Sequence, residues 1–385
     1  MKIGVTGVAS SKFGELWSVS PRALVKYVAE RALAESGLEP TDIDAFYVGN
    51  MLSGILGGQE NLGSLFAEEI GTTAPAFKIE GACASGGLAI HNAILGILSG
   101  QYKKVLVVGV EKMTDHKPEE VTVALMGAGS EAERIAGLTF PGLYSLIARE
   151  YMDKYKISEK ELAAVAVKNH YHGSLNPNAQ FQNPITIEKV LESPCVADPL
   201  KLLDCSPISD GASAVVLTAE SLVSKKQNPI WITGSAAATD SLGLYNRKSL
   251  TSLAATQAAA KTAYQQAGIQ PNDIDVAEVH DCFTIAELLA LEDLGFYKKG
   301  TSGKAVLGGE LTLNSSKKIA VNTSGGLKAC GHPVGATGVK QVVEIVEQLR
   351  GNLGKRQVKN ANVGLTHNVG GSGAVAVVHI LSQEH

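Results

Sequence analysis

The strongest constraint on the fold is that the chain repeats a segment of itself. The stretch SGLEPTDIDAFYVGN, residues 36–50, aligns at a constant offset with AGIQPNDIDVAEVHD, residues 267–281. Both copies follow an alanine-rich stretch and lead into an apolar run. A second pair in the same order, residues 210–221 and 370–382, places a glycine-rich turn before a β-branched strand. Pro-x-Asp-Ile-Asp is also a common connector between a helix and a strand, but two ordered matches favour a duplicated α/β unit.

The segment between the two copies differs from both of them. It is more charged and less regular, and TFPGLYSLIAREYMDKYK and SEKELAAVAVKNHYHG within it are expected to be helices. The second of these begins with a capping box, Ser158 to Glu161. The 385 residues suffice for two or three domains. We predict an N-terminal half of residues 1–116 and 206–225, an inserted loop domain of residues 117–205, and a C-terminal half of residues 226–385.

Composition excludes several classes of function. The net charge is −4 with no basic stripe, so no nucleic-acid partner is expected. No secretory h-region opens the chain and no apolar run is long enough for a membrane span. The 5 cysteines are odd in number and scattered, and C-x-x-C and H-E-x-x-H are missing, so neither a disulfide framework nor a metal site is expected. A cytoplasmic enzyme is the expectation.

Cys83 stands where GACASGG leads into an apolar helix, at about residues 84–98, which we expect to be buried nearly all round. A helix N-terminus can lower the pKa of a thiol and hold an oxyanion, and small neighbours let an acyl group approach the sulfur. The pattern matches a nucleophile elbow with cysteine in place of serine. A small buried cysteine in a tight helix entry fits this segment equally well.

His332 occupies a second helix entry, in GGLKACGHPVGATG. Valines at 339, 342, 343 and 346 predict a helix with one buried face, and Pro333 suits its first turn. An imidazole at such a position is disfavoured as a cation, so a neutral His332 could accept a proton or donate to a carbonyl. The alternative is that His332 only caps the helix. The surrounding glycines favour the first interpretation, because they allow a ligand or another chain segment to approach closely.

A third junction carries EVHDCF, where a strand gives way to an amphipathic helix. His280 and Cys282 lie at the junction, and Asp281 is expected to be the N-cap of that helix. Ligands of open α/β sheets bind where strands end and helices begin. A fourth stretch, THNVGGSG at residues 366–373, is expected to belong to a hairpin whose N–H groups could complete an anion pocket, or which is only a turn.

With these motifs the sequence resembles the thiolase family over essentially its whole length. GACASGGLAI resembles the nucleophilic-cysteine motif, GHPVGATG the family's G-H-P-x-G-A-T-G motif, and NHYHGSLNPNAQF a segment of its loop domain. The resemblance implies an α/β thiolase fold: two duplicated halves in a layered αβαβα core, central helices between two sheets, and an inserted loop domain that helps to bind coenzyme A.

Two differences from the common thiolases indicate which branch of the family the sequence resembles. HDCF stands where they have N-E-A-F, and Asn368 stands where they have a second reactive cysteine. This combination is similar to the sterol-carrier-protein-type thiolases and to archaeal acetyl-CoA acetyltransferases. Some archaeal members work in a complex with a small OB-fold zinc protein, and thiolases form homodimers or homotetramers.

The resemblance implies a role for each site residue. Cys83 is the nucleophile, His332 activates it, and Cys282 replaces the missing second cysteine as acid/base near neutral pKa. The N–H groups of Cys83 and Gly370 form one oxyanion pocket, and His332 with His280 forms the other. Phe283 lines the substrate channel. The substrates are acyl-CoA and CoA, with no cofactor and no metal.

The roles of four further residues and two alternative functions stay open. Cys330 is expected to be a small buried residue, and His367 could orient the hairpin. Arg247 and Lys248 are candidates for contacts with CoA phosphates. Two other functions remain: a ketoacyl-synthase-like condensing enzyme that loads an acyl carrier protein, and a non-catalytic scaffold subunit.

Overall fold

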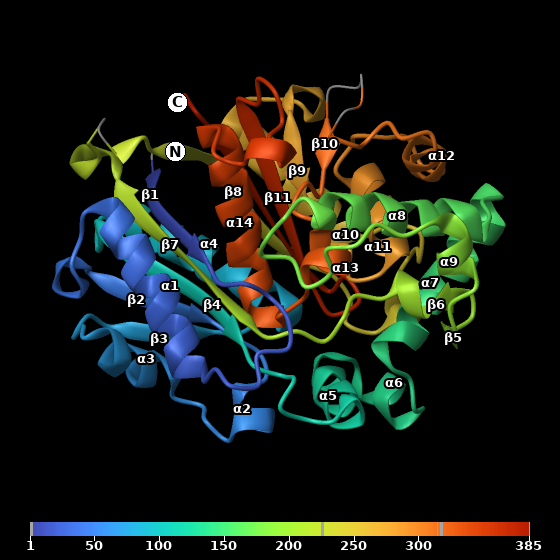
Figure 1. Cartoon of the computed structure of the whole chain (residues 1–385), viewed down its shortest axis with the longest axis horizontal. Helices are drawn as coiled ribbons and strands as arrows, with labels where there is room; N and C mark the ends of the chain where they lie inside the picture. Colours follow the sequence, from blue (N-terminus) through green and yellow to red (C-terminus); the bar gives the residue numbers. More distant parts are fainter. Residues whose placement is uncertain (1–2, 225–226, 314, 316–318, 385) are drawn as a thin grey trace.

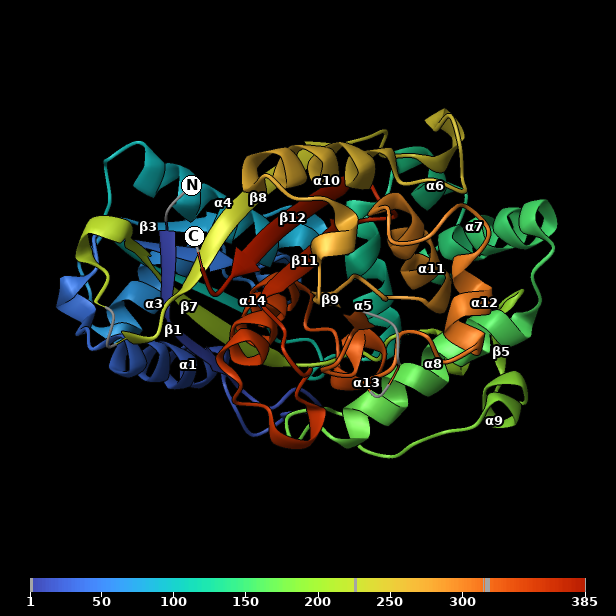
Figure 2. The same ribbon diagram turned by 90° about the horizontal axis from the view of Figure 1, so that it is seen from above.

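The computed structural model describes residues 3–224, 227–313, 315 and 319–384. Within them, a mixed sheet of ten strands has the order β10-β9-β11-β12-β8-β1-β7-β4-β2-β3 (Figures 1 and 2). The order is a mirror image about its centre, since β1, β7, β4, β2 and β3 correspond to β8, β12, β11, β9 and β10. The predicted duplicated α/β architecture is therefore confirmed. The strands are β1 Ile3–Ser10, β2 Ala45–Gly49, β3 Ala76–Ile79, β4 Lys104–Glu111, β7 Gly211–Ala219, β8 Ile230–Thr239, β9 Val276–Glu278, β10 Ala320–Val321, β11 Val363–Gly370 and β12 Val375–Ser382.

The two halves join at the centre of the sheet. The resemblance predicted two sheets, but β1 pairs with β8 through Ile3, Gly4 and Val5, which merges them into one. This pairing is much shorter than that of β1 with β7, which extends from Ile3 to Ser10. In the sheet, the two halves are thus joined only by this short strand pairing.

Two central helices, α4 Ser85–Leu98 and α14 Val334–Arg350, pack against one another between the halves (Figure 1). A Cβ on Gly86 would lie 2.7 Å from the carbonyl oxygen of Gly335, so this approach requires glycine. The expectation of a fully buried first helix is wrong at its C-terminal end, where Leu95 and Leu98 are 50% and 53% exposed. The outer helices are α1 Pro21–Ser36 and α3 Leu62–Ile70 on the first half and α10 Ala254–Ala267 on the second.

The inserted segment forms a helical layer beside the second half (Figure 2). Its helix α8 begins with the predicted capping box of Ser158 and Glu161 and packs on the short helices α12 Ser302–Leu307 and α13 Gly326–Cys330. Its helix α7 contacts α11 Thr284–Asp293. The elements of this segment are α5 Pro118–Leu125, α6 Glu131–Ile135, α7 Phe140–Tyr155, α8 Glu159–Ser174, α9 Ile187–Leu191, β5 Cys195–Ala197 and β6 Leu200–Lys201. None of the helices in the described part of the chain has the length and hydropathy needed to cross a bilayer.

Candidate active site

Cys83 sits on a sharp turn ahead of α4. The preceding residue, Ala82, has φ of 54°, a left-handed conformation that is uncommon for alanine and stores strain. Ser85 holds the turn closed, because its hydroxyl accepts from the N–H of Gly81 at 3.0 Å and donates to the carbonyl of Ala82 at 2.6 Å. The strained turn presents the thiol to a cavity, and the role of Cys83 as a nucleophile stays a prediction at this point.

His332 lies between α13 and α14, and its hydrogen bonds define its tautomer. Nδ1 is 2.7 Å from the hydroxyl of Thr337, which donates its single proton to the carbonyl of Pro333 at 3.1 Å. The hydroxyl must therefore accept from Nδ1–H, and Nε2 of neutral His332 carries a free lone pair. Nε2 is buried and has no partner within the described structure. Nε2 of His332 can therefore accept a proton.

His280 has the opposite tautomer, set by Asn368 on β11. The Oδ1 atom of Asn368 accepts from the N–H of Gly87 at 3.1 Å, so its Nδ2 faces the other way. Nδ2 donates to the carbonyl of Cys83 at 3.0 Å and lies 3.3 Å from Nδ1 of His280. Because an amide nitrogen only donates, Nδ1 of His280 accepts, and the ring proton is on Nε2. That N–H is buried and unpartnered among the described residues, and is available to an oxyanion.

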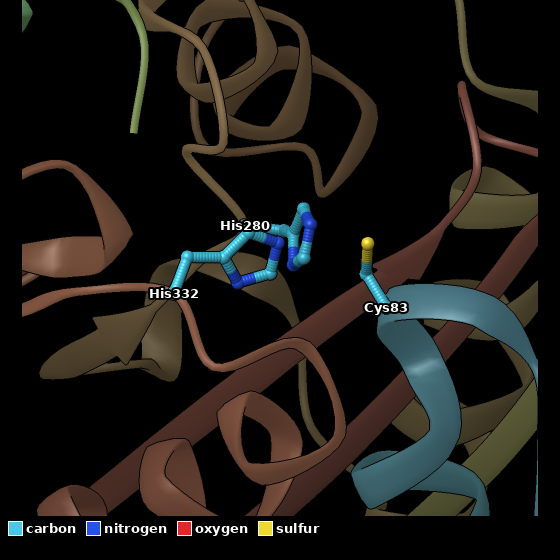
Figure 3. Close-up of side chains that lie close together, drawn as sticks. All are labelled: Cys83, His280 and His332. Atoms are coloured by element: carbon cyan, nitrogen blue, oxygen red, sulfur yellow. The ribbon is translucent and has the colours of Figure 1, made fainter. Parts of the chain in front are cut away.

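The structure brings Cys83, His280 and His332 together from three segments (Figure 3). The sulfur and one nitrogen of each ring all lie within 4.8 Å of one another, and the two imidazoles meet edge to face at 5.1 Å between centroids. This combines a thiol, a proton acceptor and a hydrogen-bond donor. The same set of donors could hold a metal ion, and the expectation of no metal site stays a prediction.

Burial dominates the protonation of this cluster. Desolvation, followed by the carboxylate of Glu111, raises the pKa of the Cys83 thiol to about 12. The prediction of a lowered pKa at the helix entry is therefore wrong. Burial also lowers the pKa of His332 to about 3 and that of His280 well below its ordinary value. Both rings are neutral, so a thiolate must form by proton transfer during the reaction.

Cys282 is buried in the wall of the same cavity, at 6% exposure. Desolvation raises its pKa well above the ordinary value, so the predicted near-neutral pKa is wrong. Its thiol interacts with the hydroxyl of Tyr144 on α7, a residue that the sequence reasoning missed. No motif marks Tyr144, because its position follows only from the packing of the inserted segment.

Asp281 does not cap the helix that follows it. α11 begins after Phe283 without a side-chain cap, and Asp281 instead accepts from the N–H groups of Leu327 at 2.7 Å and Lys328 at 3.2 Å. Asn169 on α8 donates to the same carboxylate at 2.7 Å. Asp281 thereby fastens α13, which leads into His332, to the strand end that carries His280 and to the inserted segment.

The glycine-rich hairpin turn approaches the nucleophile. The N–H of Gly371, one residue beyond the predicted Gly370, interacts with the sulfur of Cys83. Arg247, a candidate for phosphate contact, instead donates to the carbonyl and hydroxyl of Ser372 at 2.6 and 3.1 Å. Its guanidinium therefore braces this turn. The role of Gly370 in an oxyanion pocket stays a prediction.

Two other predicted residues lie near the site without reaching it. His367 is 2.8 Å through Nε2 from the hydroxyl of Thr256 on α10, which ties the hairpin to that helix. Cys330 is buried as expected, at 2% exposure, and Asn176 donates to its sulfur at 3.7 Å.

The site opens into a mostly apolar cavity of about 150 Å³. The catalytic candidates form one side of it, together with Phe283, the predicted channel residue. The inserted segment and the stretch that follows it form the other side. The remaining lining residues, from these and other segments, are Met113, Thr122, Leu125, Phe140, Pro141, Tyr144, Cys205, Ser206, Pro207, Ile208, Val334 and Gly371.

Comparison with known proteins agrees with this architecture. The family model "Thiolase, N-terminal domain" matches residues 3–221 and "Thiolase C-terminal domain-like" matches residues 236–383. An acetyl-CoA acetyltransferase of Methanothermobacter thermautotrophicus is 46% identical, with 99% of each chain covered. Human sterol carrier protein 2 is 33% identical over 98% of this chain and 71% of its own length.

Solved structures share the fold. A chain of an Ltp2-ChsH2(DUF35) aldolase superposes with a TM-score of 0.85 at 23% identity, covering 100% of this chain and 98% of that one. An acetyl-CoA acetyltransferase from Syntrophomonas wolfei gives a TM-score of 0.74 at 20% identity, covering 100% and 99%. The chain therefore belongs to the thiolase family, and it is an enzyme of the thiolase acyltransferase type.

Proposed function

We propose that the enzyme condenses two acetyl-CoA molecules to acetoacetyl-CoA, and in reverse cleaves a 3-ketoacyl-CoA by thiolysis, through an acyl group on Cys83. The observation that carries the proposal is the cluster of the Cys83 thiol, a basic Nε2 on His332 and a donating Nε2–H on His280. CoA thioesters are the substrates, and no bound cofactor is required.

The first half-reaction loads the cysteine. His332 Nε2 takes the proton of Cys83 as the sulfur attacks the thioester carbon of acetyl-CoA. N–H groups at the strained turn and the hairpin, those of Cys83 and of Gly370 or Gly371, stabilise the oxyanion. The carbon–sulfur bond to CoA breaks, and the leaving thiolate takes a proton from Cys282. This leaves acetyl-Cys83, a Cys282 thiolate and a protonated His332.

The second half-reaction forms the carbon–carbon bond. The Cys282 thiolate removes an α-proton from a second acetyl-CoA, and burial makes this thiolate a stronger base than a free one. The N–H groups of His280 and His332 stabilise the enolate oxygen. The enolate carbon attacks acetyl-Cys83, and the departing Cys83 thiolate recovers its proton from His332.

The two alternative functions would give different experimental results. A ketoacyl-synthase-like enzyme would pass its acyl group only to a malonyl unit on a carrier protein, and a scaffold subunit would not be acylated. The similarity to acetyl-CoA acetyltransferases over the full chain supports the thiolase reaction.

Peptide mass spectrometry after incubation with acetyl-CoA tests the proposal. We expect an acetyl group on the Cys83 peptide of the wild type, its loss in Cys83→Ala, and its transfer to a second acetyl-CoA. An unmodified Cys83 peptide would sink the enzyme mechanism, and transfer to malonyl-carrier protein alone would sink the thiolase reaction.

For the oligomeric state, we infer a homodimer through the edge of the first half. β3 pairs only with β2 in the described sheet, and Phe77 on β3 is 39% exposed. Leu95 and Leu98, on the α4 helix that packs against β3, add exposed apolar surface. Light scattering after chromatography should give a dimer mass for the wild type and a monomer for Leu95→Lys/Leu98→Lys; an unchanged mass would contradict this interface.

We also propose that this chain binds a partner protein and that it is located in the cytoplasm. One structural neighbour is described as an Ltp2-ChsH2(DUF35) aldolase, which supports a protein partner for this chain. From the resemblance to archaeal thiolases, we propose that this partner is a small OB-fold zinc protein. Co-purification of the tagged chain with that partner from the source cells would support the complex. If the two purified proteins do not bind when they are mixed at equal concentration, the complex is not direct.

A further inference from the structure

We propose that Tyr144 sets the acyl-chain length of the enzyme, because its ring forms a rigid wall of the acyl pocket beside Cys83 that admits short acyl groups only. This inference rests on the proposed function and defines its substrate class. Nothing in the motifs assigns a role to this residue, which comes from the inserted segment.

The position of Tyr144 follows from the register of α7. Phe140, Pro141 and Tyr144 line the cavity, and residues four apart lie on one face of a helix. The cavity they face also contains the nucleophile. An acyl group on Cys83 must therefore extend into a space that α7 partly fills.

Three contacts keep the ring of Tyr144 in place. It stacks on Phe283 with 4.6 Å between centroids and an interplanar angle of 29°. Its hydroxyl donates to the carbonyl of Gly371 at 3.3 Å and interacts with the thiol of Cys282. At 1% exposure, the side chain has little free space around it. A ring held at both its face and its hydroxyl cannot swing aside for a longer chain.

The size of the cavity agrees with a short acyl group. Its volume is about 150 Å³, several times the space that one water molecule needs. An acetyl or acetoacetyl group fits such a space beside the reacting thioester. A medium-length chain would require displacement of the packed wall, which a dense interior resists.

The test measures the rate of Cys83 acylation by acetyl-, butyryl-, hexanoyl- and octanoyl-CoA, using peptide mass spectrometry on the full chain. In the wild type, the rate should fall about tenfold or more once the chain meets the ring. Tyr144→Leu and Tyr144→Ala should raise the hexanoyl-to-acetyl ratio about tenfold or more, because they open the wall. Tyr144→Phe keeps the ring and should keep the wild-type ratio.

Tyr151→Leu is the matched control on the same helix. Tyr151 is also buried, but its hydroxyl donates to Glu292 on α11 at 2.5 Å, and Tyr151 does not line the cavity beside Cys83. Its replacement should lower the melting temperature and leave the chain-length ratio unchanged. If Tyr144→Leu destabilises the fold too far, Tyr144→Trp enlarges the wall and should lower the butyryl-to-acetyl ratio.

The outcomes separate this inference from the proposed function. An unchanged ratio in a folded Tyr144→Leu that still takes an acetyl group would overturn the role of Tyr144, as would a wild type that takes octanoyl as fast as acetyl. If no acyl-CoA modifies Cys83 in the wild type, the proposed function fails instead.

Discussion

The amide nitrogen of Asn368 lies 3.3 Å from Nδ1 of His280, and this contact determines which nitrogen of the histidine carries the proton. Asn368 cannot reverse its amide, because Gly87 donates to its oxygen from the other side at 3.1 Å. The resemblance to the family places Asn368 where common thiolases have a reactive cysteine, and in this structure Asn368 has a different role. It prepares His280 as a hydrogen-bond donor through Nε2.

We predict that Asn368→Asp lowers the rate of condensation about 100-fold, the usual effect of losing one oxyanion donor. The new carboxylate oxygen would face Nδ1 of His280, so the ring proton would move to Nδ1. NMR of ¹⁵N-labelled histidine should report Nε2–H in the wild type and Nδ1–H in the variant.

Asn176→Asp is the control for this substitution, because Asn176 is another buried asparagine but contacts Ser324 and Cys330 instead. It should leave the His280 signals unchanged. A wild-type enzyme with its His280 proton on Nδ1 would contradict the assigned role of Asn368.

Cys282→Ala should separate the two half-reactions. The variant retains Cys83 and His332, so an acetyl group should still appear on Cys83, although more slowly. Exchange of α-protons of acetyl-CoA with deuterated water should fall by about 10² to 10⁴, the range for loss of a general base. Cys330→Ala removes a buried cysteine on α13 that does not line the cavity, and should exchange at the wild-type rate. Wild-type exchange in Cys282→Ala would assign the base elsewhere.

The pH dependence of Cys83 alkylation follows from its raised pKa. Since the pKa of the Cys83 thiol is about 12, the thiolate fraction should increase with pH throughout the range in which the protein is stable. Alkylation by iodoacetamide should accelerate about tenfold per pH unit from pH 7 to pH 9. A plateau within that range, followed by mass spectrometry of the Cys83 peptide, would indicate a preformed thiolate.

The sequence predicted the parts of this site that depend on local pattern. Repeated strand and turn signals predicted the mirrored halves, and the junction rule selected Cys83, His280 and His332, whose sulfur and ring nitrogens the fold brings within 4.8 Å of one another. Such features survive folding because a strand end beside a helix start has nearly the same geometry in any α/β unit.

The errors concern contacts between distant segments. Asp281 fits the local pattern of an N-cap, but the N–H groups of α13 lie closer in the folded chain. The predicted thiol pKa values are wrong because the helix-entry effect is local, whereas the effect of burial is stronger and cannot be seen in the motif. Tyr144 and the tautomer set by Asn368 likewise depend on packing between residues far apart in sequence.

Buried histidines should also make stability depend on pH. Burial, together with nearby His91, lowers the pKa of His379 to about 3, and its ring contacts Ser235 and the carbonyl of Gly87. The unfolded chain takes up a proton at this residue below about pH 6.5, and the folded chain does not. Stability contributed by the neutral ring is therefore present above pH 6.5 and is lost as the pH falls toward 3.

His379→Gln should remove this dependence. From pH 7 to pH 5, one such histidine costs about 2 kcal/mol of unfolding free energy. Guanidinium unfolding at both pH values should show a decrease that is smaller by this amount in His379→Gln than in the wild type. His116→Gln, which removes a partly exposed histidine beside Glu120, is the matched control. Equal decreases in His379→Gln and the wild type would mean that His379 takes up its proton in the folded state as well.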